Sequence, residues 1–315
     1  MRGRPETIFA RALCALTFLV ASLVRIGPAS ADEPLFGYTY TADLLPMGKW
    51  ELEQWITDRE GQAFGHYHNF KFRTEVEYGL TDNFQLWGYV NYTYLNAKDN
   101  SVAHLTEGLD IPFNHDPTKQ YSAMRFDGIS VEGIYRFLSP YKDPIGLAVY
   151  LEPEVGPREQ ALEIRLILQK NFFDDRLVVA ANAWIEFEHE QGSNLVTPGS
   201  GDVPDGAIEK ATMAEIDVGV SYRFLPRWWG GIEFRNHNEF EGFSLAYRNM
   251  EHTAFFLGPT IHYGSERWWI TISALGQVGA IGVSSENKAQ MRGNRIFGDE
   301  HTSWDGIRVR VGYNF

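Results

Sequence analysis

The last nine residues, Ile307-Arg308-Val309-Arg310-Val311-Gly312-Tyr313-Asn314-Phe315, place an apolar side chain at every second position up to the final aromatic ring. A period of two separates an apolar from a polar face, as a β-strand does and a helix cannot. The same alternation recurs along the chain beyond Gly48. It predicts twelve strands, near 49–58, 68–80, 84–95, 126–137, 145–155, 161–171, 177–188, 212–224, 228–236, 252–263, 268–280 and 304–315.

The connections between these strands alternate in length. Short connections lie at 81–83, 138–144, 172–176, 225–227 and 264–267, and longer ones include 96–122, 189–210, 237–250 and 281–303. Short turns at one end, long loops at the other and an even strand number are typical of a transmembrane barrel. The segment 156–160 is an exception, being short at the long-loop end. We therefore expect an all-β fold: a transmembrane antiparallel up-and-down β-barrel of about 12 strands over residues 48–315.

The charged residues follow the same two-residue period. None of the 63 positions on the apolar parity of these strands is Asp, Glu, Lys or Arg, whereas 18 of the 51 interleaved positions are. A charge that faces lipid at mid-depth costs about 2–4 kcal/mol, whereas one that faces a wet or ion-paired interior is tolerated. A soluble sandwich also buries an apolar face, so the pattern favours a membrane barrel without excluding the soluble alternative.

Aromatic residues flank the short turns and the C-terminus. They are Tyr78, Phe84, Phe137, Phe172, Phe173, Phe224, Trp228, Trp229, Tyr263, Trp268, Trp269, Tyr313 and Phe315. Amphipathic rings are enriched where lipid headgroups meet hydrocarbon. We therefore predict an aromatic girdle at one rim of the barrel.

The N-terminus has the features of a secretory signal. Arg2, Arg4 and Arg11 precede the apolar stretch 12–24, and Ala29-Ser30-Ala31 follows it. A basic start, a short apolar core and a small-x-small exit predict cleavage after Ala31. Residues 1–31 are then a cleaved signal peptide, and 32–47 form a periplasmic N-terminal segment.

Composition narrows the function classes. The mean hydropathy of −0.29 excludes a bundle of membrane-spanning helices. The net charge of −13 becomes −16 once the signal is removed, because it carries four Arg and one Glu. This acidic balance argues against a nucleic-acid partner. The single cysteine, Cys14, lies inside the signal, so the mature chain has no thiol for disulfides or thiolate sites.

The terminal strand resembles that of Gram-negative outer-membrane β-barrel proteins, through Ile307, Val309, Val311, Tyr313 and Phe315. The segment 44–53 also resembles the start of barrels in an uncharacterised outer-membrane family. The resemblance implies that the chain lies in the cell outer membrane of a Gram-negative bacterium, in contact with its lipid. It also implies that the barrel-assembly machinery reads the terminal strand. It implies no established activity.

The polar parity supplies the candidate lumen. Its best cluster is Glu51, Glu53, Glu75 and Glu77, which face Arg308 and Arg310 across the barrel closure. The same residues could equally form ion pairs that hold the first strand to the last. The lumen-lining candidates are Glu51, Glu53, Lys71, Arg73, Glu75, Glu77, Glu132, Arg136, Glu163, Arg165, Glu215, Asp217, Arg223, Arg308 and Arg310. They suggest a passive channel or transporter for small polar solutes, biased toward cations. A plugged structural or adhesin barrel is the alternative, with the same charges paired internally.

Histidines gather near the predicted outer loops, at positions 66, 68, 104, 115, 189, 237, 252 and 301. His66 and His68 share a strand face but lack an identified third ligand, so we assign no metal site and no cofactor. His301 and Ser303 share lipid-facing parity near the outer rim and are similar to the His-x-Ser pair of outer-membrane phospholipases. That leaves a rim hydrolase as a further alternative, although no Asn can be assigned as its third member.

Overall fold

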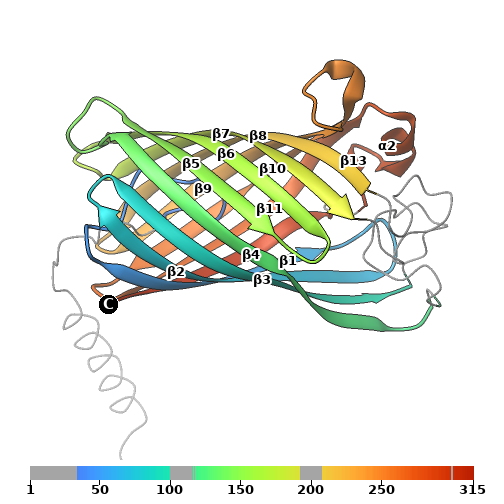
Figure 1. The fold of residues 1–315 in the computed structure, drawn as a ribbon, viewed down its shortest axis with the longest axis horizontal. Helices are drawn as coiled ribbons and strands as arrows, with labels where there is room; N and C mark the ends of the chain where they lie inside the picture. The colour runs from blue at the N-terminus through green and yellow to red at the C-terminus, as the bar shows by residue number, and fades with distance from the viewer. Residues whose placement is uncertain (1–33, 100–115, 117, 192–207, 299–300) are drawn as a thin grey trace, which may run out of the picture.

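A closed antiparallel barrel of twelve strands forms the body of the molecule (Figure 1). The computed structural model describes residues 34–99, 116, 118–191, 208–298 and 301–315. Consecutive barrel strands pair with each other, and β1 pairs with β14 to close the barrel. The strands are β1 (Trp50–Glu60), β2 (His66–Thr81), β3 (Phe84–Lys98), β4 (Tyr121–Leu138), β5 (Gly146–Val155), β6 (Glu159–Phe172), β7 (Leu177–Gln191), β8 (Ile208–Leu225), β9 (Trp228–Glu241), β10 (Met250–Gly264), β11 (Trp268–Gly282) and β14 (Trp304–Asn314).

Each of the twelve strands predicted from the alternation is present, which confirms the predicted fold class. The sequence did not predict four short elements in the longer loops: η2 (Tyr247–Asn249), α2 (Ser285–Gln290), β12 (Met291–Arg292) and β13 (Arg295–Ile296). The side chain of Ser284 caps α2 by accepting a hydrogen bond from the Asn287 backbone nitrogen. Helices of the described residues are all too short or too polar to cross a membrane.

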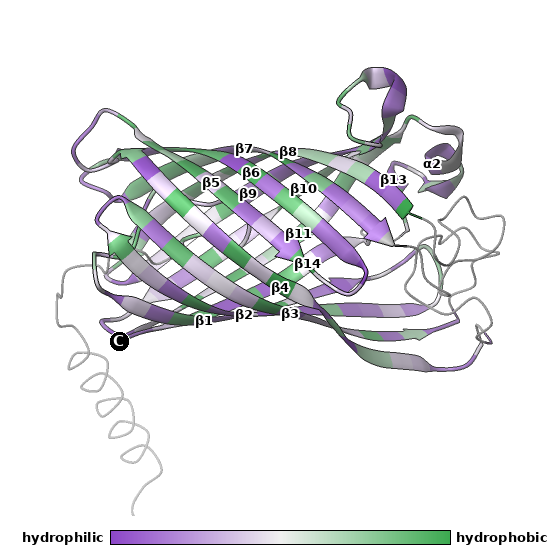
Figure 2. Cartoon of the chain, viewed as in Figure 1, coloured by the Kyte–Doolittle hydropathy of each residue, from purple (hydrophilic) through white to green (hydrophobic). Residues whose placement is uncertain are grey.

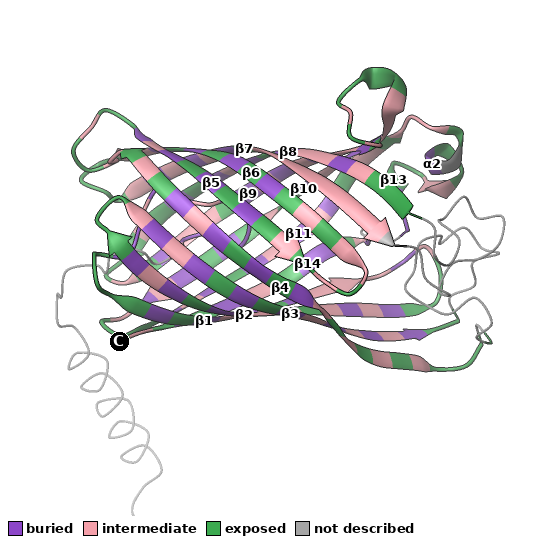
Figure 3. Cartoon of the chain, viewed as in Figure 1, coloured by how far each residue is buried: buried purple, intermediate pink, exposed green. Residues whose placement is uncertain are grey.

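The two faces of the barrel wall differ as the alternation requires. Apolar side chains such as Val76, Ile129 and Ile232 are exposed on the outside. Charged side chains such as Glu132 and Glu233 are buried on the inside. Alternating bands along each strand show this in hydropathy and in burial (Figures 2 and 3). The chain therefore has an apolar outer surface and a polar interior.

Outward aromatic rings line the end of the barrel that carries the short turns. Trp228 lies 4.9 Å from Tyr263, which lies 5.1 Å from Trp268, measured between ring centroids. The predicted girdle also included Trp229 and Trp269, and for these two the structure corrects the prediction. Both are buried and point inward, because each directly follows an outward tryptophan on its strand.

Candidate functional site

The N-terminal segment 34–45, hereafter the plug, lies inside the barrel. Leu35, Phe36, Tyr38 and Leu44 are all buried. Residues 32–47 were predicted to form a periplasmic segment, but residues 34–45 instead lie in the lumen, and only Pro46 and Met47 of the described part are exposed. The physical reason is its composition: residues 34–42 are apolar, aromatic or small and carry no charge. Burial inside the barrel removes these side chains from water.

Glu233 on β9 is the main anchor of the plug. Its two carboxylate oxygens accept hydrogen bonds from the backbone nitrogens of Gly37, Tyr38 and Thr39, at 2.8, 2.8 and 3.0 Å. The hydroxyl of Ser273 donates to the same carboxylate at 2.6 Å. Glu233 is fully buried. These contacts replace water for three backbone donors that no strand pairing satisfies.

Inward amides and guanidinium groups bind the rest of the plug backbone. Asn182 accepts from the Tyr40 nitrogen at 2.7 Å and donates to the Tyr40 oxygen at 2.9 Å. The Ala42 nitrogen donates to Gln169 at 2.7 Å. Arg308 donates to the Gly37 oxygen at 2.9 Å. The plug is thus held by side chains of the wall and does not add a strand to the sheet.

Two tyrosines of the plug lie against inward arginines of the wall. The guanidinium carbon of Arg308 is 3.8 Å from the centroid of the Tyr38 ring, and that of Arg235 is 4.6 Å from it. Arg165 lies 4.7 Å from the Tyr40 ring. Such cation–π contacts strengthen when they are desolvated, as here.

Small residues of the wall make room for the plug. A Cβ added at Gly219 would lie 2.6 Å from the Phe36 ring, and one added at Gly306 would lie closer still to the Tyr38 hydroxyl. Any larger residue at these two positions would collide with the plug. The absence of a side chain there is therefore part of the binding site.

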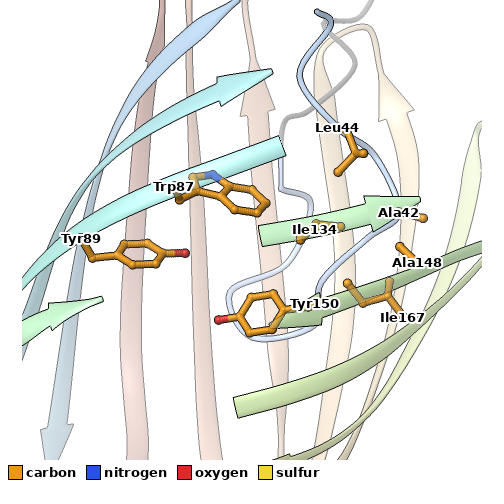
Figure 4. Close-up of a cluster of buried hydrophobic side chains, with 8 residues drawn as sticks. All are labelled: Ala42, Leu44, Trp87, Tyr89, Ile134, Ala148, Tyr150 and Ile167. Atoms are coloured by element: carbon orange, nitrogen blue, oxygen red, sulfur yellow. The ribbon is translucent and has the colours of Figure 1, made fainter. Parts of the chain in front are cut away.

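The end of the plug packs in an apolar cluster on the inner wall of β3 to β6 (Figure 4). Ala42 and Leu44 come from the plug. The other buried members are Trp87, Tyr89, Ile134, Ala148, Tyr150 and Ile167. Burial of apolar area at about 25 cal/mol per Å² adds a hydrophobic contribution to the hydrogen bonds of the plug.

Buried ion pairs join strands of the wall around the plug, both neighbouring strands and strands farther apart in the barrel order. Arg310 and Glu53 form a two-bond pair across the closure between β14 and β1, at 2.5 and 2.9 Å. Arg165 binds Glu163 at 2.8 Å and Asp217 at 3.1 Å. A further buried network runs from Glu215 through Arg235 to Asp305 on β14.

The predicted lumen candidates face the interior, but in different settings. Ten are buried: Glu51, Glu53, Glu75, Glu77, Glu132, Glu163, Arg165, Glu215, Asp217 and Arg310. Arg73, Arg136, Arg223 and Arg308 are half-buried, and Lys71 is exposed toward the long-loop end. The predicted cluster of four glutamates and two arginines across the barrel closure is only partly assembled. Arg310 pairs with Glu53, whereas Arg308 donates to the Thr57 hydroxyl at 2.8 Å and to the plug.

The burial of these charges indicates a closed lumen. In an open channel the inward side chains would be wet, yet Glu132, Glu233 and Asp217 are at most 1% exposed. A cavity of about 30 Å³ lies between the plug and the wall, next to Glu53 and Arg310. That volume holds roughly two water molecules.

Near the turns, burial raises the pKa of the Asp43 carboxyl, and hydrogen bonds with Tyr141 and Gln169 offset part of the rise.

The residues that hold the plug were not predicted from the sequence. Glu233 was one of the 18 inward charges, but nothing marked it as an anchor, because its partners are backbone groups about 195 positions away in the chain. Inward amides such as Asn182 and Gln169 gave no signal either. Uncharged polar side chains on an inner face are unremarkable until their partner is placed.

One of the histidines, His301, is placed differently from the prediction. His301 was expected to share lipid-facing parity with Ser303, but it is buried, with its Nε2 atom 3.0 Å from Nε2 of His252. The reason is that the stretch before β14 folds inward and bridges to Gly298. His68 contacts Asp58 at 3.0 Å. His104 and His115 lie outside the described residues.

Comparison with known proteins identifies a family. The chain belongs to the family described as "Family of unknown function (DUF6662)", whose model matches residues 28–315. No curated protein matches the chain. The fold is similar to that of the COG4313 outer membrane channel from Pseudomonas putida F1, with a TM-score of 0.57 and 8% identity over 87% of this chain and 98% of that one. The NanC porin is a weaker match, with a TM-score of 0.48 and 9% identity over 84% and 98%. At these identities the likeness shows the fold alone, which is that of outer-membrane barrels.

Proposed function

We propose that this member of a family of unknown function is an outer-membrane channel for small polar solutes that its own N-terminal plug holds closed. The observation that carries the proposal is the way the plug is bound. Wall side chains such as Glu233 and Asn182 hold it by hydrogen bonds to its backbone. Water can replace these bonds, and withdrawal of the plug breaks no pairing of the closed barrel sheet, so the plug is displaceable without opening the barrel.

The path of the plug supports displacement toward the turns. The hydroxyl of Thr271, near the start of β11, donates to the Pro34 oxygen. At the other end, the Gly48 nitrogen donates to the Gly79 oxygen at 2.7 Å, close to the short turn after β2. The plug therefore enters and leaves at the short-turn end, and it can withdraw as a loop without being threaded through the barrel.

The inner wall supports polar and cationic solutes. The 18 charged positions on the predicted inward parity are 11 acids and 7 bases, and several of these acids, such as Glu75 and Glu132, are buried inside the barrel. Rings of carboxylates favour cations in pores. In this proposal, outer-membrane lipid surrounds the apolar outer face of the barrel, and the barrel-assembly machinery recognises residues 307–315.

Planar-bilayer conductance tests the proposal. Wild-type protein should conduct rarely, whereas a variant that lacks residues 34–45 should conduct steadily and prefer cations in a salt gradient. Glu154→Gln is the matched control, because Glu154 is an inward acid that binds Asn91 and Ser130 rather than the plug. Swelling of liposomes in sugars of increasing size then bounds the solute. A plug-free barrel that is folded but carries no current would overturn the channel.

A structural barrel is the second candidate, and the buried ion pairs favour it. Arg235, for example, joins β9 to β8 and β14 through Glu215 and Asp305. If such pairs fill the lumen without the plug, the folded plug-free variant stays closed. The rim hydrolase is not supported, because His301 is buried and faces His252 rather than Ser303.

A further inference from the structure

Three buried histidines meet inside the barrel near the end that carries the long loops. His237 comes from β9, His252 from β10 and His301 from the stretch before β14. One ring nitrogen of each lies within 4.8 Å of those of the other two. The ring centroids are 5.9, 5.4 and 4.3 Å apart. We infer that these three histidines form a binding site for a divalent transition-metal ion, best suited to Zn²⁺.

The distances suit tetrahedral coordination. Zinc–nitrogen bonds of about 2.0–2.1 Å place ligand nitrogens about 3.3 Å from each other. His252 Nε2 and His301 Nε2 are already 3.0 Å apart. A small movement of the His237 ring completes a three-histidine set. A hydrogen bond between His252 and His301 would explain that pair alone, but not the approach of a third imidazole to the same point.

The surroundings of the three rings match those of metal-bound histidines. The Nδ1 atom of His237 lies 3.0 Å from Oε2 of Glu215, the arrangement in which a carboxylate orients a histidine that ligates through its other nitrogen. Arg235 holds Glu215 in place through two hydrogen bonds. Glu239 Oε2 lies 3.6 Å from His252 Nε2 and its side chain is 31% exposed. Because it is partly exposed and lies beside His252, Glu239 is an acidic candidate for a fourth ligand.

Strand pairing and backbone hydrogen bonds fix the positions of the three histidines. His237 is paired with Ala254, so His237 and His252 are inward neighbours on adjacent strands. The amide of Gln62 exchanges two hydrogen bonds with the backbone of Gly298, at 2.9 and 3.2 Å. The His301 nitrogen in turn donates to the Gly298 oxygen at 3.0 Å. A bound metal would therefore fasten the loop that carries α2, β12 and β13 to the wall of β9 and β10.

Metal binding by the full-length protein in detergent tests the site. Tag-free protein is treated with EDTA, dialysed against Zn²⁺ or Co²⁺ and analysed for bound metal and for the absorption of tetrahedral cobalt. We expect one equivalent per chain with the spectrum of a nitrogen-rich site. His237→Gln, His252→Gln and His301→Gln should each weaken binding by on the order of 100-fold or more.

Two control variants and a second readout make the result decisive. His262→Gln removes a buried histidine that contacts Thr271 near the opposite end, and His68→Gln removes the one beside Asp58; neither should change binding. Zn²⁺ should also slow tryptic cleavage at the exposed Arg295 in wild type, but not in His301→Gln. Heat-modifiable migration on gels verifies that each variant is folded. Absence of stoichiometric metal, or equal loss in the controls, would overturn the site.

Discussion

Both Glu233 and Tyr38 are buried, and the carboxylate of Glu233 accepts the Tyr38 backbone hydrogen bond at 2.8 Å although the residues are 195 positions apart in the chain. The same carboxylate serves Gly37 and Thr39. Loss of this one side chain leaves three buried N–H groups without their acceptor. Each such group costs about 1–3 kcal/mol. The contact thus governs whether the plug stays in the lumen.

Glu233→Ala should release the plug while leaving the barrel folded. The expected result is an increase of at least tenfold in the time that single channels spend open, because about 3 kcal/mol or more of plug binding is lost. Planar-bilayer recordings measure it, with Glu154→Gln as the control that should behave as wild type. Equal open times in Glu233→Ala and wild type would show that this anchor does not hold the gate.

Gly219→Val should displace the plug by steric overlap. A Cβ at this position would lie 2.6 Å from the Phe36 ring, whereas one at Gly88 would meet nothing within 4 Å. Trypsin sites introduced into the plug should become accessible in Gly219→Val and stay protected in Gly88→Val. Protection in both variants would mean that the wall or the plug absorbs the added volume.

Arg310→Ala should weaken the closure of the barrel. Arg310 and Glu53 are a buried pair that joins the last strand to the first, and removal of one partner leaves an uncompensated charge. Such a loss costs about 3–5 kcal/mol. Urea unfolding in detergent measures the free energy of unfolding. The double variant Arg310→Met with Glu53→Gln should recover part of the lost free energy of unfolding. A double-mutant cycle that shows no coupling energy between the two positions would contradict the pairing.

Phe315→Ala should reduce assembly in the outer membrane. Phe315 ends the apolar face of the terminal strand and is 68% exposed, as suits a ring that another protein reads. Phe173→Ala is the matched control, because Phe173 is a similarly exposed ring in a short turn, at 71%. We expect at least a severalfold drop in folded, membrane-extracted protein for Phe315→Ala alone. An equal drop in both variants would point to a general loss of rim aromatics.

Val220→Arg should test which solvent the outer face meets. Val220 is 41% exposed on β8, between the inward Gly219 and Ser221. A charge facing lipid near mid-depth costs about 2–4 kcal/mol, whereas one facing water costs almost nothing. Refolding into lipid vesicles, monitored by urea titration, should show this loss for Val220→Arg and little for Val220→Leu. A neutral effect of arginine would contradict a lipid-facing surface.

The sequence by itself determined the barrel. Alternation is local: a strand needs only its own residues to separate an apolar from a polar face, so each of the twelve strands was readable from its own segment. The side of the wall on which Glu53, Arg165 or Asp217 lies followed from the same parity. The short elements of the outer loops, such as α2, were not readable, because they depend on contacts with the barrel mouth.

Only the tertiary structure decided what fills the barrel. The plug, its anchor Glu233 and the meeting of His237, His252 and His301 all join groups far apart in the chain, and no periodicity encodes such pairs. Burial of the uncharged segment 34–42 is favourable only once a lumen of matching size and polarity surrounds it. Parity established which side chains point inward, and three-dimensional packing established what they hold.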